Sequence, residues 1–257
     1  MKAAFLCMIV ALALTPKAGA APLEAAAESH RHHLLEDVGQ ALASARALRE
    51  RLAAHDLDGA KRAWVAARVG WERSEVYTSG FVPELDQQID AWPNATHGFH
   101  GIEAALFGAS RADPAEETEA LISHLADLKA QIGGIDLSPQ RLLNGIARLA
   151  FEIGGNKANG GESRLSGTSL NDIQSNVDGI ELAYRVIFSA AIEAGDPRLA
   201  GDVRATIERI KATVRTSDLR HLDTEMLRAD SEELVALLQS AAPKIGLSKP
   251  TLEEGSQ

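Results

Sequence analysis

The apolar residues of this chain recur every three or four positions along most of its length, and this period limits its fold more than any other feature. In residues 169–194 the apolar side chains share one stripe: Leu170, Ile173, Val177, Ile180, Tyr184 and Ile187. Such spacing places side chains on one face of an α-helix, whereas a half-buried strand alternates with period two. Runs with period two are nearly absent. We therefore expect an all-α protein.

Capping residues, prolines and glycines divide the chain into helices and loops. We expect helices over residues 23–54, 56–79, 97–107, 113–132, 138–153, 169–194, 196–215 and 231–242. Asp58 is expected to cap the second helix, and Gly108 to end the third. Residues 81–96 are expected to form a loop with turns, because two prolines and Asn94 interrupt them. The glycine-rich residues 154–168 predict a second long loop.

A glycine pair, Gly133 and Gly134, breaks the helical pattern near the middle of the chain. About four helices precede this break and about four follow it, which predicts two four-helix bundles packed into one compact unit. We expect residues 21–134 to form an N-terminal bundle and residues 135–257 a C-terminal bundle. A chain of this length can bury enough apolar surface to hold such a fold without disulfides.

Residues 1–20 have the pattern of a secretory signal peptide. A positive start precedes an apolar run over residues 3–14, and Ala18-Gly19-Ala20 offers a small-residue cleavage site. The run is too short for a stable transmembrane helix, and no cysteine occupies the lipoprotein position. The only cysteine of the chain belongs to this segment, so we expect no disulfides. We predict a periplasmic protein without a lipid anchor or, in its mature form, a transmembrane helix.

The charge of the chain limits its partners. The formal net charge is −10, and residues 1–20 carry two lysines and no acids, which leaves −12 for the remainder. Such an acidic protein is a poor partner for nucleic acid or an anionic membrane, whereas it suits cations. We expect a monomer.

Three histidines lie close together early in the chain: His30, His32 and His33. Exposed histidines can catch metal ions, but these three do not all share one helix face. We interpret them as a solvated helix start.

The stretch "GFHGIEAALFG", residues 98–108, places a histidine and a carboxylate one turn apart in an otherwise apolar helix. On a helical wheel Glu103 falls inside the apolar arc, His100 lies at its edge, and His97 points away from it. A buried carboxylate must be paired, protonated or bound to a cation. An ion pair with an arginine and a metal site with His100 as co-ligand both satisfy this requirement. His97 is interpreted mainly as a helix-start residue.

Two further acids extend this pattern. The segment "WVAARVGWERSE" puts Trp64, Trp71 and Glu75 on one helix face, with Glu72 about a quarter turn away. The segment "DQQIDAWP" adds Asp90 on the way to the histidine helix. One imidazole and three carboxylates suit a hard or borderline cation such as iron, manganese, zinc or calcium. Taken singly, Glu75 is better explained as a solvated helix end and Asp90 as a turn acid.

These segments, together with "ESRLSGTSLNDIQSNVDGIELAYR" at residues 162–185, resemble the imelysin superfamily. That superfamily includes imelysin and the EfeO- and EfeM-type periplasmic components of iron uptake. The resemblance runs in order across residues 64–188, and the family signature G-x-H-x-x-E is met by Gly98, His100 and Glu103. It implies an exported protein of two four-helix bundles with a link to iron acquisition.

The resemblance also implies site residues. The expected metal ligands are His100, Glu103, Glu75 and Asp90. The residues expected to support this site, or to line the cleft between the bundles, are Arg164, Ser166, Asn176 and His97. From the residues alone, Ser166 belongs to a loop ahead of a helix cap, and Asn176 could equally bond only backbone.

Three functions are compatible with the sequence. The first is a periplasmic protein that binds iron as Fe²⁺ or Fe³⁺, or Zn²⁺ or another divalent cation, for an inner-membrane permease or outer-membrane uptake components. The second is a metallopeptidase of imelysin type, but the chain has no H-E-x-x-H motif. The inverted zincin motif H-x-x-E-H requires a second histidine directly after the glutamate, and Ala104 occupies that position after Glu103. The third is a polysaccharide-binding protein, which the acidic charge and the scarcity of aromatic residues disfavour.

Overall fold

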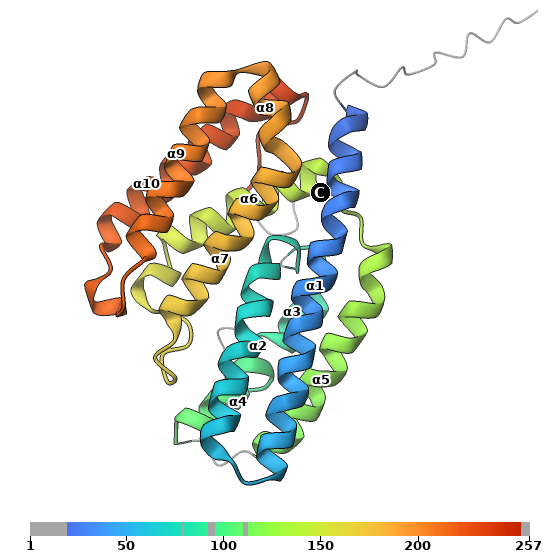
Figure 1. Ribbon diagram of the computed structural model, residues 1–257, viewed down its shortest axis with the longest axis vertical. Coiled ribbons are helices and arrows are strands. Elements are labelled where there is room, and N and C mark those ends of the chain that lie inside the picture. Colours follow the sequence, from blue (N-terminus) through green and yellow to red (C-terminus); the bar gives the residue numbers. More distant parts are fainter. Residues whose placement is uncertain (1–19, 79, 92–95, 110–112, 253–257) are drawn as a thin grey trace, which may run out of the picture.

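The computed structural model describes residues 20–78, 80–91, 96–109 and 113–252, and every regular element in these ranges is helical (Figure 1). The all-α prediction is therefore confirmed. No helix in the same ranges combines the length and the apolarity that crossing a membrane requires. Apart from Ala20, the predicted signal peptide lies outside the described residues.

The helices form two sets that are consecutive in sequence. The first set is α1 (Ala20–Ala53), α2 (Leu57–Thr78), α3 (Pro83–Ile89), α4 (Gly98–Phe107) and α5 (Pro114–Gln131). The second set is α6 (Pro139–Gly154), α7 (Ser169–Ala183), α8 (Ser189–Gly195), α9 (Pro197–Val214) and α10 (Thr224–Ala241). In Figure 1, α1 lies beside α2 and α5, and α10 lies beside α9. The boundary between residues 134 and 135 remains a prediction.

Aspartates fix where several helices begin. The Asp113 carboxylate accepts a hydrogen bond from the Ala115 backbone N–H at 2.9 Å, as expected for the start of α5. Asp223 accepts one from Met226 N–H at 2.9 Å, so α10 begins seven residues earlier than the predicted start at residue 231. Helix α2 lies within one residue of its predicted bounds, but its predicted cap was wrong, because Asp56 rather than Asp58 accepts a hydrogen bond from the Gly59 N–H.

Two other segments differ from the prediction. Residues 81–96 contain a short helix, α3, which starts at Pro83 because proline is well suited to the first helical position. The long helix predicted over residues 169–194 is interrupted by a π-helical turn, Tyr184–Phe188, between α7 and α8. A π turn holds one extra residue within a helix, and sequence periodicity over a few turns does not reveal it.

Helix α2 joins the two sets through backbone-to-backbone contacts at glycines. A Cβ atom on Gly145 of α6 would lie 2.1 Å from the carbonyl oxygen of Val76, and one on Gly179 of α7 would lie 2.5 Å from that of Arg73. Only glycine permits such an approach. Helix α2 is thus enclosed by α1 on one side and by α6 and α7 on others, and its tryptophans Trp64 and Trp71 are fully buried.

Substitution at these contacts tests the packing of α2. We expect Gly145→Ala to lower the free energy of unfolding by about 1–3 kcal/mol, the usual cost of overpacking. Gly201→Ala in α9 is the matched control, because no atom lies within 4 Å of its Cβ position. Alanine is the better helix former by up to about 1 kcal/mol, so the control should not lose stability. Urea unfolding of both variants checks this, and a Gly145→Ala protein as stable as the control would contradict the close approach.

One histidine of the early group is buried rather than solvated. His32 is 72 % exposed, as interpreted from the sequence, but His30 is fully buried and its ring centre lies 4.9 Å from that of Tyr77. The interpretation was therefore wrong for His30. Burial, together with the nearby His33, lowers the pKa of His30 to about 3.

This burial predicts a loss of stability in mild acid. Below pH 6.5 the unfolded chain protonates His30 whereas the folded protein does not, so unfolding becomes easier by about 1.4 kcal/mol per pH unit until about pH 3. We expect His30→Phe to show a correspondingly weaker pH dependence of the unfolding free energy between pH 4.5 and 6.5. His32→Phe should keep the wild-type slope. Urea titrations at several pH values measure the slopes, and equal slopes for wild type and His30→Phe would refute the assignment.

Candidate functional site

A group of buried ionisable side chains lies where α2, α4, α7 and the loop before α7 meet. We call it the charged cluster, and its described members are six carboxyls, two permanent cations and one imidazole: Glu72, Glu75, Asp90, Glu103, Glu162, Asp172, Arg68, Lys157 and His100. All of them are at least nine-tenths buried. Buried charges at this density must neutralise one another or bind something that does.

The imidazole side of the cluster is built by α4. His100 Nδ1 lies 3.2 Å from Glu103 Oε2, and His100 Nε2 lies 3.7 Å from Asp90 Oδ2. The other oxygen of Glu103 accepts hydrogen bonds from Ser166, at 2.9 Å from the backbone N–H and 2.8 Å from the hydroxyl. Glu103 is 4 % exposed, so the helical wheel correctly placed it inside.

The glycine of the signature holds this geometry. Gly98 has a φ of +57°, and a Cβ atom there would lie 2.3 Å from the carbonyl oxygen of Ile89. Glycine is the residue that tolerates both conditions. Because α4 begins directly against the end of α3, His100 comes beside Asp90, which caps the C-terminus of α3.

Arg68 of α2 lies at the centre of the acids. Its guanidinium pairs with Asp90 and with Glu72, one turn further along the helix. It also lies 3.1 Å from Asp172 Oδ2 and 3.6 Å from Glu162 Oε2. One side chain therefore links α2 with the end of α3, the loop before α7 and α7 itself.

Lys157 is the second cation of the cluster. Its ammonium nitrogen lies 2.8 Å from Glu75 Oε2, 2.9 Å from Glu162 Oε2 and 3.1 Å from Glu72 Oε2. Asn176 of α7 supports two of these acids, because its Nδ2 donates to Glu72 Oε2 and Glu75 Oε2, both at 2.9 Å. Its role is thus broader than a bond to backbone.

The acids fall into two electrostatic groups. Burial raises the pKa of Asp172 to about 7 and, with the charge of Glu72, raises that of Glu75 well above its usual range; burial also raises the pKa of Glu162. At Asp90 the Arg68 charge outweighs burial and holds the pKa low. The cluster therefore contains more carboxyls than its own cations keep ionised.

The imidazole behaves oppositely. Burial alone would lower the pKa of His100, but its bonds to Asp90 and Glu103 outweigh burial and raise the pKa to about 9. At Glu103 the bonds from His100 and Ser166 outweigh burial and lower the pKa. At neutral pH these two residues form an ion pair.

The structure brings together three of the four predicted ligands, His100, Glu103 and Asp90. Glu75 belongs to the same cluster, but its carboxylate contacts Lys157 and Asn176. Whether any of these residues binds a metal remains a prediction.

Of the four residues predicted to support the site, two contact the charged cluster and two lie away from it. Ser166 bonds Glu103, and Asn176 bonds the acids of α2. His97 turns away, with Nε2 3.1 Å from the carbonyl oxygen of Gln87. Arg164 is exposed, and its Nε donates to the Gly160 carbonyl at 2.6 Å. His97 and Arg164 therefore make no contact with the cluster among the described interactions.

Sequence reasoning missed five members of the cluster: Arg68, Glu72, Lys157, Glu162 and Asp172. Glu72 was expected about a quarter turn from the face that carries Glu75 and was not predicted as a site residue, but it is fully buried because α2 is enclosed on several sides. Arg68, Glu72 and Glu75 stand at helical spacing i, i+4 and i+7, and this pattern was the available signal. Oxygens of Glu72, Glu162 and Asp172 lie within 4.8 Å of one another, close enough to share a cation.

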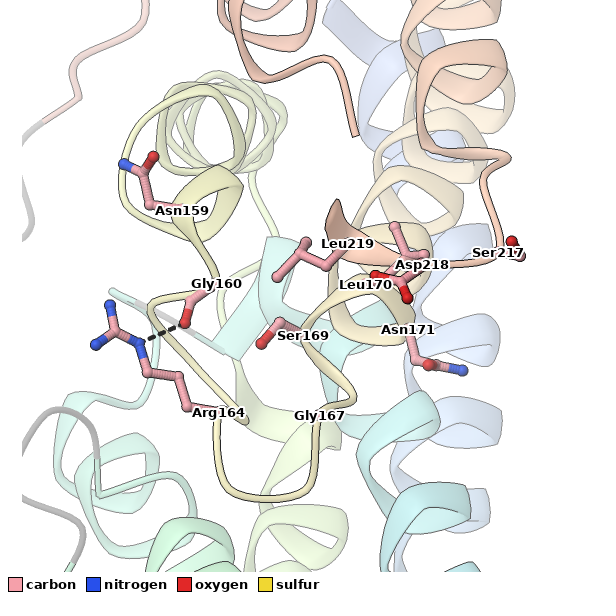
Figure 2. Close-up of a pocket in the computed structure, with 10 residues that line it drawn as sticks. All are labelled: Asn159, Gly160, Arg164, Gly167, Ser169, Leu170, Asn171, Ser217, Asp218 and Leu219. Carbon is pink, nitrogen blue, oxygen red and sulfur yellow. Dashed lines mark hydrogen bonds between the residues drawn. The ribbon is translucent and has the colours of Figure 1, made fainter. Parts of the chain in front are cut away.

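A polar pocket of about 470 Å³ lies over the loop that supplies Lys157 and Glu162 (Figure 2). Its lining includes Gly160, Arg164, Ser169 and Asp218, and Figure 2 shows Arg164 bonded back to Gly160 at its edge. Ser169 connects pocket and cluster, because its hydroxyl donates to the carbonyl of Glu162. The pocket is therefore a cavity adjacent to the cluster.

Fold and site together define a class: an all-α protein in which two helix sets enclose a buried, carboxylate-rich centre. The sequence profile of the Imelysin family matches residues 26–97 and 94–244, and the chain belongs to this family.

Known proteins of similar sequence include iron uptake system component EfeO. The chain is 28 % identical to that of Yersinia pseudotuberculosis over 203 residues, 74 % of this chain and 54 % of the relative. It is 28 % identical to that of Escherichia coli over 210 residues, 76 % of this chain and 55 % of the relative. The chain thus spans about half the length of these curated relatives.

A solved structure shares the fold. It is that of a protein described as an iron-regulated protein A precursor from Parabacteroides distasonis, with a TM-score of 0.70 and 16 % sequence identity. The match covers 91 % of this chain and 97 % of that chain. At this identity the likeness supports the architecture alone.

The role of Gly98 can be tested with a matched glycine. Gly98→Ala and Gly167→Ala both force alanine into a left-handed conformation, at a cost of about 1–2 kcal/mol. Only the first also collides with backbone, since nothing lies within 4 Å of the Gly167 position. We expect Gly98→Ala to lose more stability in urea unfolding and to bring the pKa of His100 down from about 9, as measured by NMR titration. Equal losses with an unchanged His100 pKa would show that Gly98 does not position α4.

Proposed function

We propose that the charged cluster binds a metal ion, iron as Fe²⁺ or Fe³⁺, and that the protein serves iron acquisition in the periplasm by holding and passing on the ion. The observation that carries the proposal is the excess of buried carboxyls: six of them face two permanent cations and one imidazole. A bound cation would favour the ionised forms of Asp172, Glu75 and Glu162, whose pKa values burial raises.

The donor atoms fit such an ion. Carboxylate oxygens and an imidazole nitrogen suit ferrous and ferric iron and tolerate zinc or manganese. The first candidate ligands are His100, Glu103, Glu75 and Asp90. The acids Glu72, Glu162 and Asp172 form a second set, whose oxygens already lie within 4.8 Å of one another. An orphaned atom supports the fit, because the Oδ1 of fully buried Asn176 has no hydrogen-bond partner among the described residues.

The relatives support iron as the cargo. The EfeO proteins of Yersinia pseudotuberculosis and Escherichia coli are named as components of an iron uptake system. We infer the same process for this chain, with an inner-membrane iron permease or outer-membrane uptake components as its partners. The signal-peptide pattern of residues 1–20 supports export to the compartment where such partners are accessible.

Metal binding to ligand variants tests the proposal. We expect the purified protein to bind ferrous iron, added alone under anaerobic conditions, with a stoichiometry of about one in isothermal titration calorimetry. His100→Ala and Glu103→Ala should each lose binding or weaken it at least about tenfold, because each removes a donor. His32→Ala, at an exposed site on α1, should bind as the wild type does.

Other results of these assays would change the assignment. Wild-type affinity in both His100→Ala and Glu103→Ala, with loss in Asp172→Asn, would move the ion to the second set of ligands. No binding of iron, manganese or zinc by wild type would remove the proposal. Proteolysis that a chelator and Glu103→Gln both abolish would favour a metallopeptidase instead.

A further inference from the structure

The ammonium of Lys157 has the surroundings of a bound cation. Three carboxylate oxygens, from Glu72, Glu75 and Glu162, lie 2.8–3.1 Å from its nitrogen, and the side chain is only 5 % exposed. An ammonium has three N–H donors, so these three acids use all of them. Lys157 thus fills a carboxylate pocket that a small cation of higher charge would also prefer.

Both sets of candidate ligands share acids with Lys157. Glu75 belongs to the first set, and Glu72 and Glu162 belong to the second. A metal ion held by either set would lie close to the ammonium inside a region of low dielectric. Two positive charges at such a distance repel strongly, and they would compete for the same oxygens.

Lys157 is better placed to leave the cluster than Arg68. Arg68 stands in the middle of α2 and contacts four acids on several elements. Lys157 stands on a three-residue 3₁₀ turn, Lys157–Asn159, inside a segment with glycines at 154, 155, 160 and 161. This turn continues into Gly160, which lines the polar pocket, so water is close to the backbone that carries Lys157.

We propose that Lys157 is a tethered competing cation: its ammonium neutralises Glu72, Glu75 and Glu162, leaves them when a metal ion binds, and returns when the ion departs. This inference rests on the proposed function of the cluster. It gives Lys157 a specific task, because an ammonium held on the same chain limits the affinity for the ion and promotes its release. A carrier that passes its cargo on needs such a limit.

Two substitutions separate charge from packing. Lys157→Met keeps the length of the side chain and removes the charge, whereas Lys157→Arg keeps the charge. We expect Lys157→Met to bind ferrous iron at least about tenfold more tightly than wild type, because the competitor is gone. Lys157→Arg should bind no more tightly than wild type. Lys249→Met, at an exposed position, is the control for loss of one lysine and should not change the affinity.

Lysine labelling of the wild-type protein gives a second readout that does not depend on the folding of a variant. Reductive methylation followed by mass spectrometry reports how accessible each ammonium is. We expect Lys157 to be protected without metal and labelled several-fold faster with ferrous iron under anaerobic conditions, whereas Lys249 should label equally fast in both.

The outcomes distinguish the two proposals. If wild type does not bind metal, the proposed function fails, and this inference falls with it. If wild type binds iron but Lys157→Met binds equally or more weakly, Lys157 is a supporting residue and the competition is refuted. If the variant does not fold, unchanged protection of Lys157 on addition of iron to wild type refutes it on its own.

Discussion

The neutralisation of buried acids by Arg68 is the constraint on which the centre of this protein depends. This guanidinium pairs with acids from α2, the end of α3, the loop before α7 and α7, and thereby ties segments that are about a hundred residues apart in sequence. Removing one partner from a buried ion network leaves an uncompensated charge, which typically costs about 3–5 kcal/mol. The arrangement of the helices around α2 and the ionisation of the cluster therefore depend on each other. A metal ion at either candidate set of ligands would share acids that already pair with Arg68.

Much of the fold follows from the sequence because it depends on local rules. Apolar period and aspartate caps located α5 and α9 closely, and the glycine after Phe107 ended α4 as predicted. The missed features depend on context. The π turn adds one residue to a helix, and the apolar spacing over a few turns does not reveal that residue. The start of α10 depends on the cap Asp223, which the sequence alone does not distinguish from other acids nearby. His30 was interpreted as solvated because no local sequence pattern indicates that Tyr77 of another helix packs against it.

The cluster shows the same division. The inward direction of Glu103 could be derived from the sequence, because a helical wheel gives the direction of each side chain relative to the apolar face of its own helix. The burial of Glu72 could not, because it depends on which neighbours enclose α2, and Lys157 and Asp172 become relevant only when the second helix set docks. Family resemblance supplied the residues of the signature and the segment that supports them. It did not supply the two cations, although they decide how many of the acids are ionised.

The glycine contacts of α2 have a consequence for how a ligand could reach the centre. Many carriers close around cargo like a clamshell, with two lobes moving about a flexible connection. Here the main chains of α6 and α7 touch that of α2 at Gly145 and Gly179, with no side chain between them to slide or rotate. Parting the lobes would break both of these contacts. We therefore expect any exchange with the interior to involve the loop between α6 and α7 rather than a separation of the two helix sets.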